Sequence, residues 1–167
     1  MLGKLRFVAL LALLGTICCM QGCTGGDSKP EGLPDLHAVT LTVTQDGSPL
    51  AGASVQLVPA DPSSNKWVSG GTTDADGNAE IKTHGKFPGA PAGKYKVTIS
   101  KTLTEDLNPE ADANDPMAEK KTKIYDLVDL KFGAAATTTA EIEVVAGSNS
   151  PEPIDVGAAI KEAQPEM

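Results

Sequence analysis

The chain has 167 residues, of which 40% are apolar and only 4% aromatic, a size that suits one folded domain and argues against a two-domain enzyme. Its 17 glycines and 12 prolines favour short strands joined by turns over long helices. With 14 basic and 22 acidic residues, the formal charge of −8 argues against nucleic acid as a partner, because phosphates attract a basic surface.

The first 22 residues have the three zones of a secretory signal peptide. Lys4 and Arg6 give a basic start, an apolar run follows over 7–17, and small or polar residues complete the segment. A membrane-spanning anchor is the alternative, but residues 7–20 number only 14, whereas a spanning helix needs roughly 20. We therefore expect residues 1–22 to direct export.

All three cysteines lie between positions 18 and 23, so no disulfide framework is expected in the rest of the chain. The run Met20, Gln21, Gly22, Cys23 resembles the lipobox of bacterial lipoproteins. In that family the signal is cut before a cysteine whose sulfur carries a diacylglycerol and whose amine is acylated. The resemblance implies lipidation at Cys23; an ordinary secretory cut that leaves a free thiol is the alternative.

Lipidation implies a mature protein held on a membrane surface, because each buried methylene contributes about 0.8 kcal/mol and several acyl chains act together. Loss of Lys4 and Arg6 with the signal leaves 12 basic and 22 acidic side chains, a charge of −10. An acidic body repels anionic headgroups, so we expect lipid rather than charge to anchor the protein. The expected location is the bacterial cell envelope, at the outer membrane or the periplasmic face.

Residues 23–36 combine the lipidation site with a stretch that has no apolar periodicity, which is typical of a flexible tether. A folded domain is expected over 37–156. Residues 157–167 form a C-terminal tail whose few apolar residues are too sparse to predict a docked helix.

Apolar and polar residues alternate in six stretches of the expected domain, a pattern typical of strands with one buried face. The first begins at His37, where Val39, Leu41 and Val43 alternate with threonines. Turns rich in Asp, Gly and Pro separate the stretches. The later apolar positions are Val55 and Leu57, Ala79 and Ile81, Tyr95, Val97 and Ile99, Ile142 and Val144, and Ile154 and Val156. The pattern predicts an all-β fold, an antiparallel β-sandwich of about seven strands around the aliphatics of two sheets.

The alternation stops between about 104 and 127, where acidic residues and asparagines precede a group of lysines. This stretch predicts a long insertion loop. Loops of more than about 15 residues in compact domains are uncommon and tend to be functional or disordered.

Three stretches resemble the carboxypeptidase-regulatory-like domain, a transthyretin-like or prealbumin-like β-sandwich of bacterial surface lipoproteins. They are Gly47–Pro59, Gly70–Ile81 and Gly89–Lys101, and Val128–Asn149 resembles the closing part of that domain. The resemblance covers 37–156 and implies a seven-stranded sandwich. It implies little about activity, because the shared residues are turn glycines, turn prolines and strand apolars.

The candidate metal sites are weak. Asp74 and Asp76 open a stretch that lacks the glycine and glutamate an EF-hand needs at its sixth and twelfth positions, so a hairpin turn is favoured. The two histidines, His37 and His84, have no nearby Cys or His partner for zinc. In the insertion, oxygen ligands for a hard cation are available, although a solvated acidic loop is favoured; these residues are Asp106, Asp112, Asn114 and Asp115. We therefore expect no metal and no cofactor.

No glycine pattern of a nucleophile elbow frames a serine or threonine, so we expect no enzymatic activity. Among the aromatic residues, Tyr95 alternates with core positions, whereas Trp67 lies in a polar loop and is the candidate glycan contact. The sequence predicts a non-enzymatic, lipid-anchored envelope protein that binds or supports an envelope protein or polysaccharide. A carbohydrate-binding module is the alternative, and an enzyme ranks third.

Overall fold

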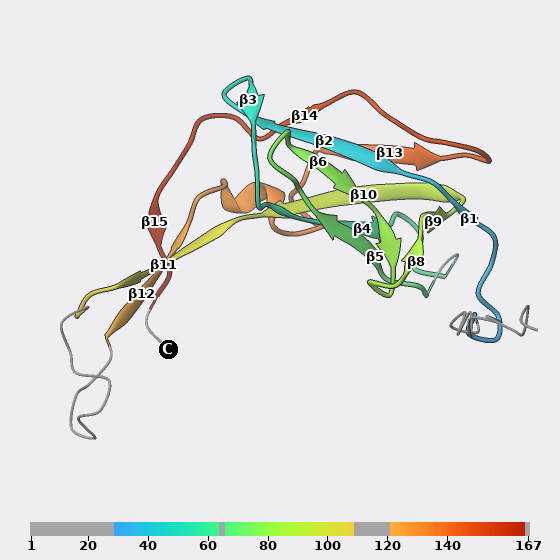
Figure 1. Cartoon of the computed structure of the whole chain (residues 1–167), viewed down its shortest axis with the longest axis horizontal. Coiled ribbons are helices and arrows are strands. Elements are labelled where there is room, and N and C mark those ends of the chain that lie inside the picture. Colours follow the sequence, from blue (N-terminus) through green and yellow to red (C-terminus); the bar gives the residue numbers. More distant parts are fainter. Residues whose placement is uncertain (1–28, 64–65, 109–120, 166–167) are drawn as a thin grey trace, which may run out of the picture. The chain divides into compact units, whose positions relative to one another are not determined.

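The computed structural model describes residues 29–63, 66–108 and 121–165, and its fold is all-β (Figure 1). The chain divides into two units, Met1–Pro30 and Glu31–Met167, and every strand lies in the second. The predicted signal peptide, Cys23 and the first part of the tether lie outside the described residues. No helix in the described part of the chain has the length and apolar character that crossing a bilayer requires.

The described residues form fifteen short strands and one 3₁₀ turn. In chain order they are β1 (Leu36–His37), β2 (Thr40–Gln45), β3 (Ser48–Pro49), β4 (Ser54–Pro59), β5 (Ser69–Thr72), β6 (Asn78–Glu80), β7 (Lys82–Thr83), β8 (Phe87–Pro88), β9 (Ala90–Pro91), β10 (Gly93–Ser100), β11 (Thr102–Asp106), β12 (Thr122–Asp126), η1 (Leu130–Phe132), β13 (Glu141–Val144), β14 (Ile154–Asp155) and β15 (Glu162–Ala163). The chain is therefore more subdivided than the seven strands predicted.

The largest sheet has six strands in the order β13-β10-β4-β5-β7-β8. Its centre is the pairing of β10 with β4, in which Val97 lies opposite Leu57. A second group of strands forms around β2, which pairs with β3, β6 and β14. Among the strand ladders of the described residues, only β14 and β2 run parallel, with Ile154 opposite Val43. Two isolated bridges, Val39 with Asn149 and Lys82 with Gly89, are also parallel. The predicted antiparallel sheets are therefore confirmed, and the parallel pair is an addition to them: the long connection after β13 lets the chain enter beside β2 in the same direction.

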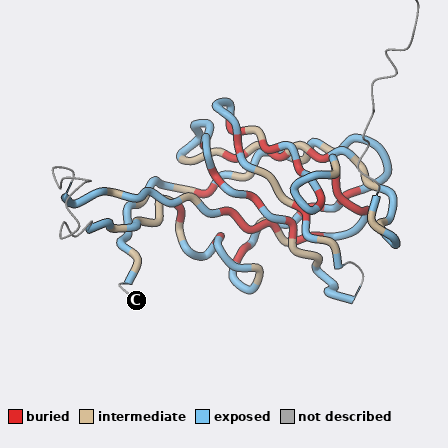
Figure 2. Tube along the Cα trace, turned by 60° about the horizontal axis from the view of Figure 1, so that its bottom comes forward, coloured by how far each residue is buried: buried red, intermediate tan, exposed pale blue. Residues whose placement is uncertain are grey.

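The core lies between the inner faces of these two groups of strands. Figure 2 shows buried segments running through the middle of the strands, with exposed turns at their ends. One continuous apolar cluster contains the inward residues of β2, β4, β10 and β13 together with Val156. The predicted inward positions are confirmed by the burial of Leu41, Val55, Val97 and Val144. Alternation identified these positions because successive strand side chains point to opposite faces.

The stretch predicted as an insertion loop begins and ends in strands. β11 and β12 pair with Thr102 opposite Asp126, and β15 from the predicted tail adds a third strand, with Ala163 opposite Tyr125. Residues 109–120 lie outside the described residues. We missed these strands because they do not bury one apolar face: Leu103 and Ile124 are about 38% and 41% exposed. Their threonine and isoleucine content still favours extended backbone.

Strand β5 was also missed, because its sequence holds two adjacent glycines. A Cβ on Gly70 would lie 2.6 Å from the carbonyl oxygen of Val55, and one on Gly71 would overlap the carbonyl oxygen of Glu80. Neighbouring backbones approach too closely for any side chain, so the strand lacks the apolar pattern that predicts strands.

Candidate functional site

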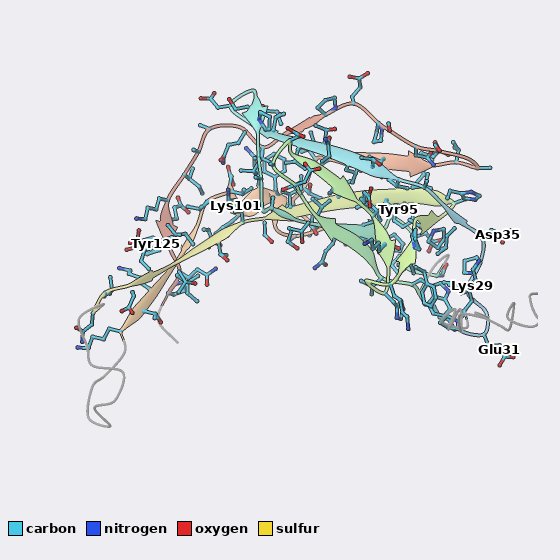
Figure 3. The ribbon with its side chains drawn as sticks, viewed as in Figure 1. Lys29, Glu31, Asp35, Tyr95, Lys101 and Tyr125 are labelled. Atoms are coloured by element: carbon cyan, nitrogen blue, oxygen red, sulfur yellow. The ribbon has the colours of Figure 1, made fainter. Side chains whose placement is uncertain are left out.

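A pocket of about 570 Å³ opens where the connection between β4 and β5 meets the small sheet of β1 and β9. Its wall includes Trp67, Asp35, His37, Ser63 and Lys66, together with three prolines. Small-molecule sites typically enclose about 300–1,000 Å³ and place a few polar groups among apolar ones. The volume and the wall therefore fit a ligand site. Asp35, labelled in Figure 3, comes directly before β1.

One wall of the pocket depends on the close pairing of β1 with β9. Leu36 lies opposite Pro91 and His37 opposite Ala90. Gly89, just before β9, has a φ of +96°, and a Cβ on it would overlap the carbonyl oxygen of His37. Glycine alone allows this backbone angle and this approach without strain. His37 is held on its other side by the backbone N–H of Gly147, which donates to its Nδ1 at 3.4 Å.

The opposite wall comes from the connection between β4 and β5, which begins with a side-chain turn. The carboxylate of Asp61 accepts hydrogen bonds from the hydroxyl of Ser63 at 2.7 Å and from its backbone N–H at 2.9 Å. These two donors hold the pKa of Asp61 below its usual value. The Ser63 hydroxyl in the pocket wall is therefore already oriented by Asp61.

Trp67 is half-buried in the pocket wall, and two neighbours hold its indole ring. The ring of His84 lies 5.2 Å away, centroid to centroid, at an interplanar angle of 59°. The Lys66 Nζ lies 5.3 Å from the centroid of the indole ring, within the range of a cation–π contact. The indole is therefore held in place before any ligand arrives.

His84 reaches Trp67 because of the tight turn between β7 and β8. His84 and Gly85 both have positive φ, of 54° and 67°, and the N–H of Lys86 donates to the carbonyl of Thr83 at 3.2 Å. Two consecutive positive φ values are typical of the type I′ hairpin turn. The backbone N–H of His84 also donates to the carbonyl of Val68 at 2.8 Å, which fixes the turn to the residue after Trp67.

The structure places Tyr95, Phe87 and Trp67 in different surroundings, so they do not form one aromatic platform. Tyr95 is only 1% exposed, so its predicted place in the core is confirmed. Phe87 lies half-buried in β8, outside the pocket wall. Of these three, Trp67 alone lines the pocket, whose wall also includes His37, and its ring contacts that of His84. The sequence thus located the central residue of the site but not a cluster of aromatic residues.

Other residues of the site were missed by sequence reasoning. Asp35 was assigned to the flexible tether, and Lys66 had no pattern that set it apart. Asp35 and Trp67 are separated by 31 intervening residues, so no local motif joins them. The one feature of the sequence that indicated the site was an isolated tryptophan in a polar loop. Large aromatic side chains are usually buried, so an exposed one indicates a binding role.

The remaining metal candidates do not form a site in the described residues. Asp74 makes a turn as predicted, and its Oδ1 accepts from the backbone N–H groups of Asp76 at 2.9 Å and Asn78 at 2.8 Å. The turn is not that of a hairpin, because it joins β5, which pairs with β4 and β7, to β6, which pairs with β2. Within 29–63, 66–108 and 121–165, no three His, Cys, Asp or Glu side chains are grouped as metal ligands would be. Asp112, Asn114 and Asp115 lie outside the described residues.

The residues that line the pocket therefore include one aromatic residue, Trp67, together with an aspartate, a histidine and a lysine. In comparisons with family models, with curated proteins and with solved structures, the chain matches none of them.

Proposed function

We propose that this protein is a non-enzymatic, lipid-anchored binding module of the bacterial cell envelope, and that its ligand occupies the Trp67 pocket. The observation that carries the proposal is the pocket itself, with a volume of about 570 Å³ and an indole ring already held by His84 and Lys66. A site formed in advance favours binding, because the protein loses little further freedom when the ligand arrives.

The anchor in this proposal is supported by the signal-like residues 1–22 and the lipobox-like run that ends at Cys23. Replacement of Cys23 by serine should move the protein from the membrane fraction to the soluble fraction. The melting temperature should stay the same, because the anchor lies outside the β-sheet core. A protein that remains membrane-bound after Cys23→Ser would overturn the lipid anchor.

The fold in this proposal is a variant of the seven-stranded, transthyretin-like sandwich of carboxypeptidase-regulatory-like domains. Support comes from the turn glycines of the resembling stretches: Gly47, Gly77 and Gly89 have φ values of 74°, 77° and 96°. These backbone angles favour glycine, so the glycines serve the turns that the resemblance implies. The ribbon of β11, β12 and β15 is then an addition to the sandwich.

The partner in this proposal is an envelope protein or a polysaccharide. Chemical crosslinking in intact cells, followed by capture through a C-terminal tag and mass analysis, would identify the partner and the acylation of Cys23 together. One dominant partner, lost when Trp67 is replaced by alanine, is the expected result. Esterase or peptidase activity that is detected in a broad screen and survives repurification of the protein would overturn the non-enzymatic assignment.

Carbohydrate binding is the second candidate function, and one observation favours it. The tryptophan singled out as a glycan contact lines the pocket rather than the core, with carboxylate and imidazole groups in the same wall. Retention on immobilised glycans, compared between the native protein and Trp67→Ala, tests this candidate.

A further inference from the structure

We infer that the Trp67 pocket takes an uncharged saccharide, with the Trp67 indole as the platform for a sugar ring and Asp35 as an acceptor for sugar hydroxyls. This inference rests on the proposed function, because it names the ligand class of the same pocket. Three features of the site lead to it: its balance of charge, the chemistry of its wall, and the local geometry that holds parts of it in place.

The balance of charge disfavours both kinds of ion. Asp35 and Lys66 put one negative and one positive group in the pocket wall. The whole chain carries a charge of −8, a field that repels anionic ligands. A cation would compete for Trp67 with the Lys66 Nζ, already 5.3 Å from the centroid of the indole ring, and would be repelled by it. An uncharged ligand avoids both electrostatic penalties, and a sugar ring that stacks on the indole displaces the Lys66 Nζ from that face of the ring.

The chemistry of the wall matches a molecule with an apolar face and polar edges. A pyranose ring has this form, since C–H groups cover its faces and hydroxyl groups surround it. The indole and the three prolines offer apolar surface, while the Asp35 carboxylate and the His37 imidazole offer hydrogen-bonding groups. A purely apolar ligand would leave that carboxylate without hydrogen bonds from the ligand, at a cost in affinity.

Parts of the site are also held in place by local geometry. The three prolines have a fixed φ, and the type I′ turn at His84 and Gly85 sets the position of the imidazole against Trp67. Saccharides exchange water for protein hydrogen bonds with little net gain, so their binding benefits when the protein groups are held in place beforehand.

The chain provides its own probe, because Trp67 is its only tryptophan. Tryptophan emission of the purified full-length protein, excited at a wavelength that the two tyrosines do not absorb, therefore reports on this pocket alone. We would titrate it with neutral oligosaccharides of glucose, galactose, mannose and N-acetylglucosamine, and with polygalacturonate as the anionic probe. The expected result is a saturable change in emission with at least one neutral series. The dissociation constant should change less than about twofold between about 50 and about 500 mM salt.

Variants then locate the binding. By calorimetry, Trp67→Ala should weaken binding by about tenfold or more, and Trp67→Phe, which retains a flat ring, should weaken it less. Asp35→Asn should weaken binding about tenfold through loss of a charge-assisted hydrogen bond. Leu130→Ala is the matched control, because the Leu130 side chain is 61% exposed and lies outside the pocket wall. This variant should bind the saccharide with the affinity of the native protein.

Two results would overturn the inference, and only one of them would also overturn the proposed function of the pocket. Binding of polygalacturonate alone, with affinity that falls steeply with salt, would overturn the uncharged ligand class but retain the pocket as a binding site. No emission change with any saccharide, together with capture of the same cellular partner by the native protein and Trp67→Ala, would overturn both the inference and the proposed pocket function.

Discussion

Replacement of Tyr95 by phenylalanine should destabilise the fold measurably, although it removes a single oxygen atom. The Tyr95 ring is 1% exposed, and its hydroxyl donates to the carbonyl oxygen of Pro91 at 2.7 Å (Figure 3 labels Tyr95). Pro91 is itself buried and pairs with Leu36, so the bond connects the start of β10 to the β1–β9 wall of the pocket.

The expected loss is about 1–3 kcal/mol in the free energy of unfolding, the usual cost when a buried acceptor loses its donor. The phenylalanine ring fills the same space, so no cavity contributes to the loss. Urea unfolding followed by far-ultraviolet circular dichroism measures the effect, and the slope of the transition should stay unchanged because the unfolded surface is the same.

Tyr125→Phe is the matched control, since Tyr125 is the only other tyrosine. Tyr125, labelled in Figure 3, lies half-buried on β12. The Lys161 Nζ lies 4.4 Å from the centroid of its ring. We expect a change within about 0.5 kcal/mol for this variant. If Tyr95→Phe costs no more than Tyr125→Phe, the buried hydrogen bond does not stabilise the fold and the reasoning is refuted.

Three further predictions concern single contacts. Gly89→Ala should destabilise the fold and lower affinity at the pocket, because Gly89 has a positive φ and a Cβ there would overlap the carbonyl oxygen of His37. Gly52→Ala is the control, since Gly52 also has a positive φ, of 70°, but a Cβ there would meet no atom within 4 Å. The difference between the urea midpoints of the two variants therefore measures the effect of the close approach. Thr73→Val should lower the free energy of unfolding by about 1–3 kcal/mol, because the buried Thr73 hydroxyl donates to the Leu50 carbonyl at 2.6 Å and accepts from the Ala53 N–H at 2.8 Å. A variant that unfolds at the same urea concentration as the native protein would contradict this prediction. Asp155→Asn should lower stability at neutral pH, since hydrogen bonds from the N–H groups of Gly47 and Gly157 and from the Thr44 hydroxyl hold the pKa of Asp155 below its usual value. A lowered pKa in the folded state stabilises the protein above the unfolded pKa of about 3.9, and this contribution is lost as the pH falls through the folded value. The stability difference between the native protein and Asp155→Asn should therefore shrink in acid, and a difference that stays constant with pH would rule out this contribution.

The strands that could be predicted are those with one buried face. In β2, β4, β10 and β13, apolar residues alternate with polar ones, and the apolar side chains are the ones that form the core. β5 was missed because its close approaches require glycines at positions 70 and 71. The ribbon strands β11, β12 and β15 were missed because partial exposure on both faces removes the alternation on which prediction depends.

The site was predicted only at its centre. Trp67 stood out as an aromatic residue in a polar loop, whereas Asp35 and His84 carried no comparable signal. They meet at the pocket through contacts between distant segments: the pairing of β1 with β9 presents Asp35 and His37, and a type I′ turn brings the His84 ring to 5.2 Å from that of Trp67. Such proximity depends on which segments far apart in the chain pair with each other, and local sequence does not encode that choice.

The sequence by itself determined the all-β class, the buried faces of the core strands and the turn at Asp74, because each depends on neighbours within a few residues. Only the tertiary structure decided the parallel placement of β14 beside β2, the ribbon and the walls of the pocket. The physical reason is the range of the interactions: side-chain alternation and turn geometry are local, whereas a pocket exists only where segments far apart in the chain come together.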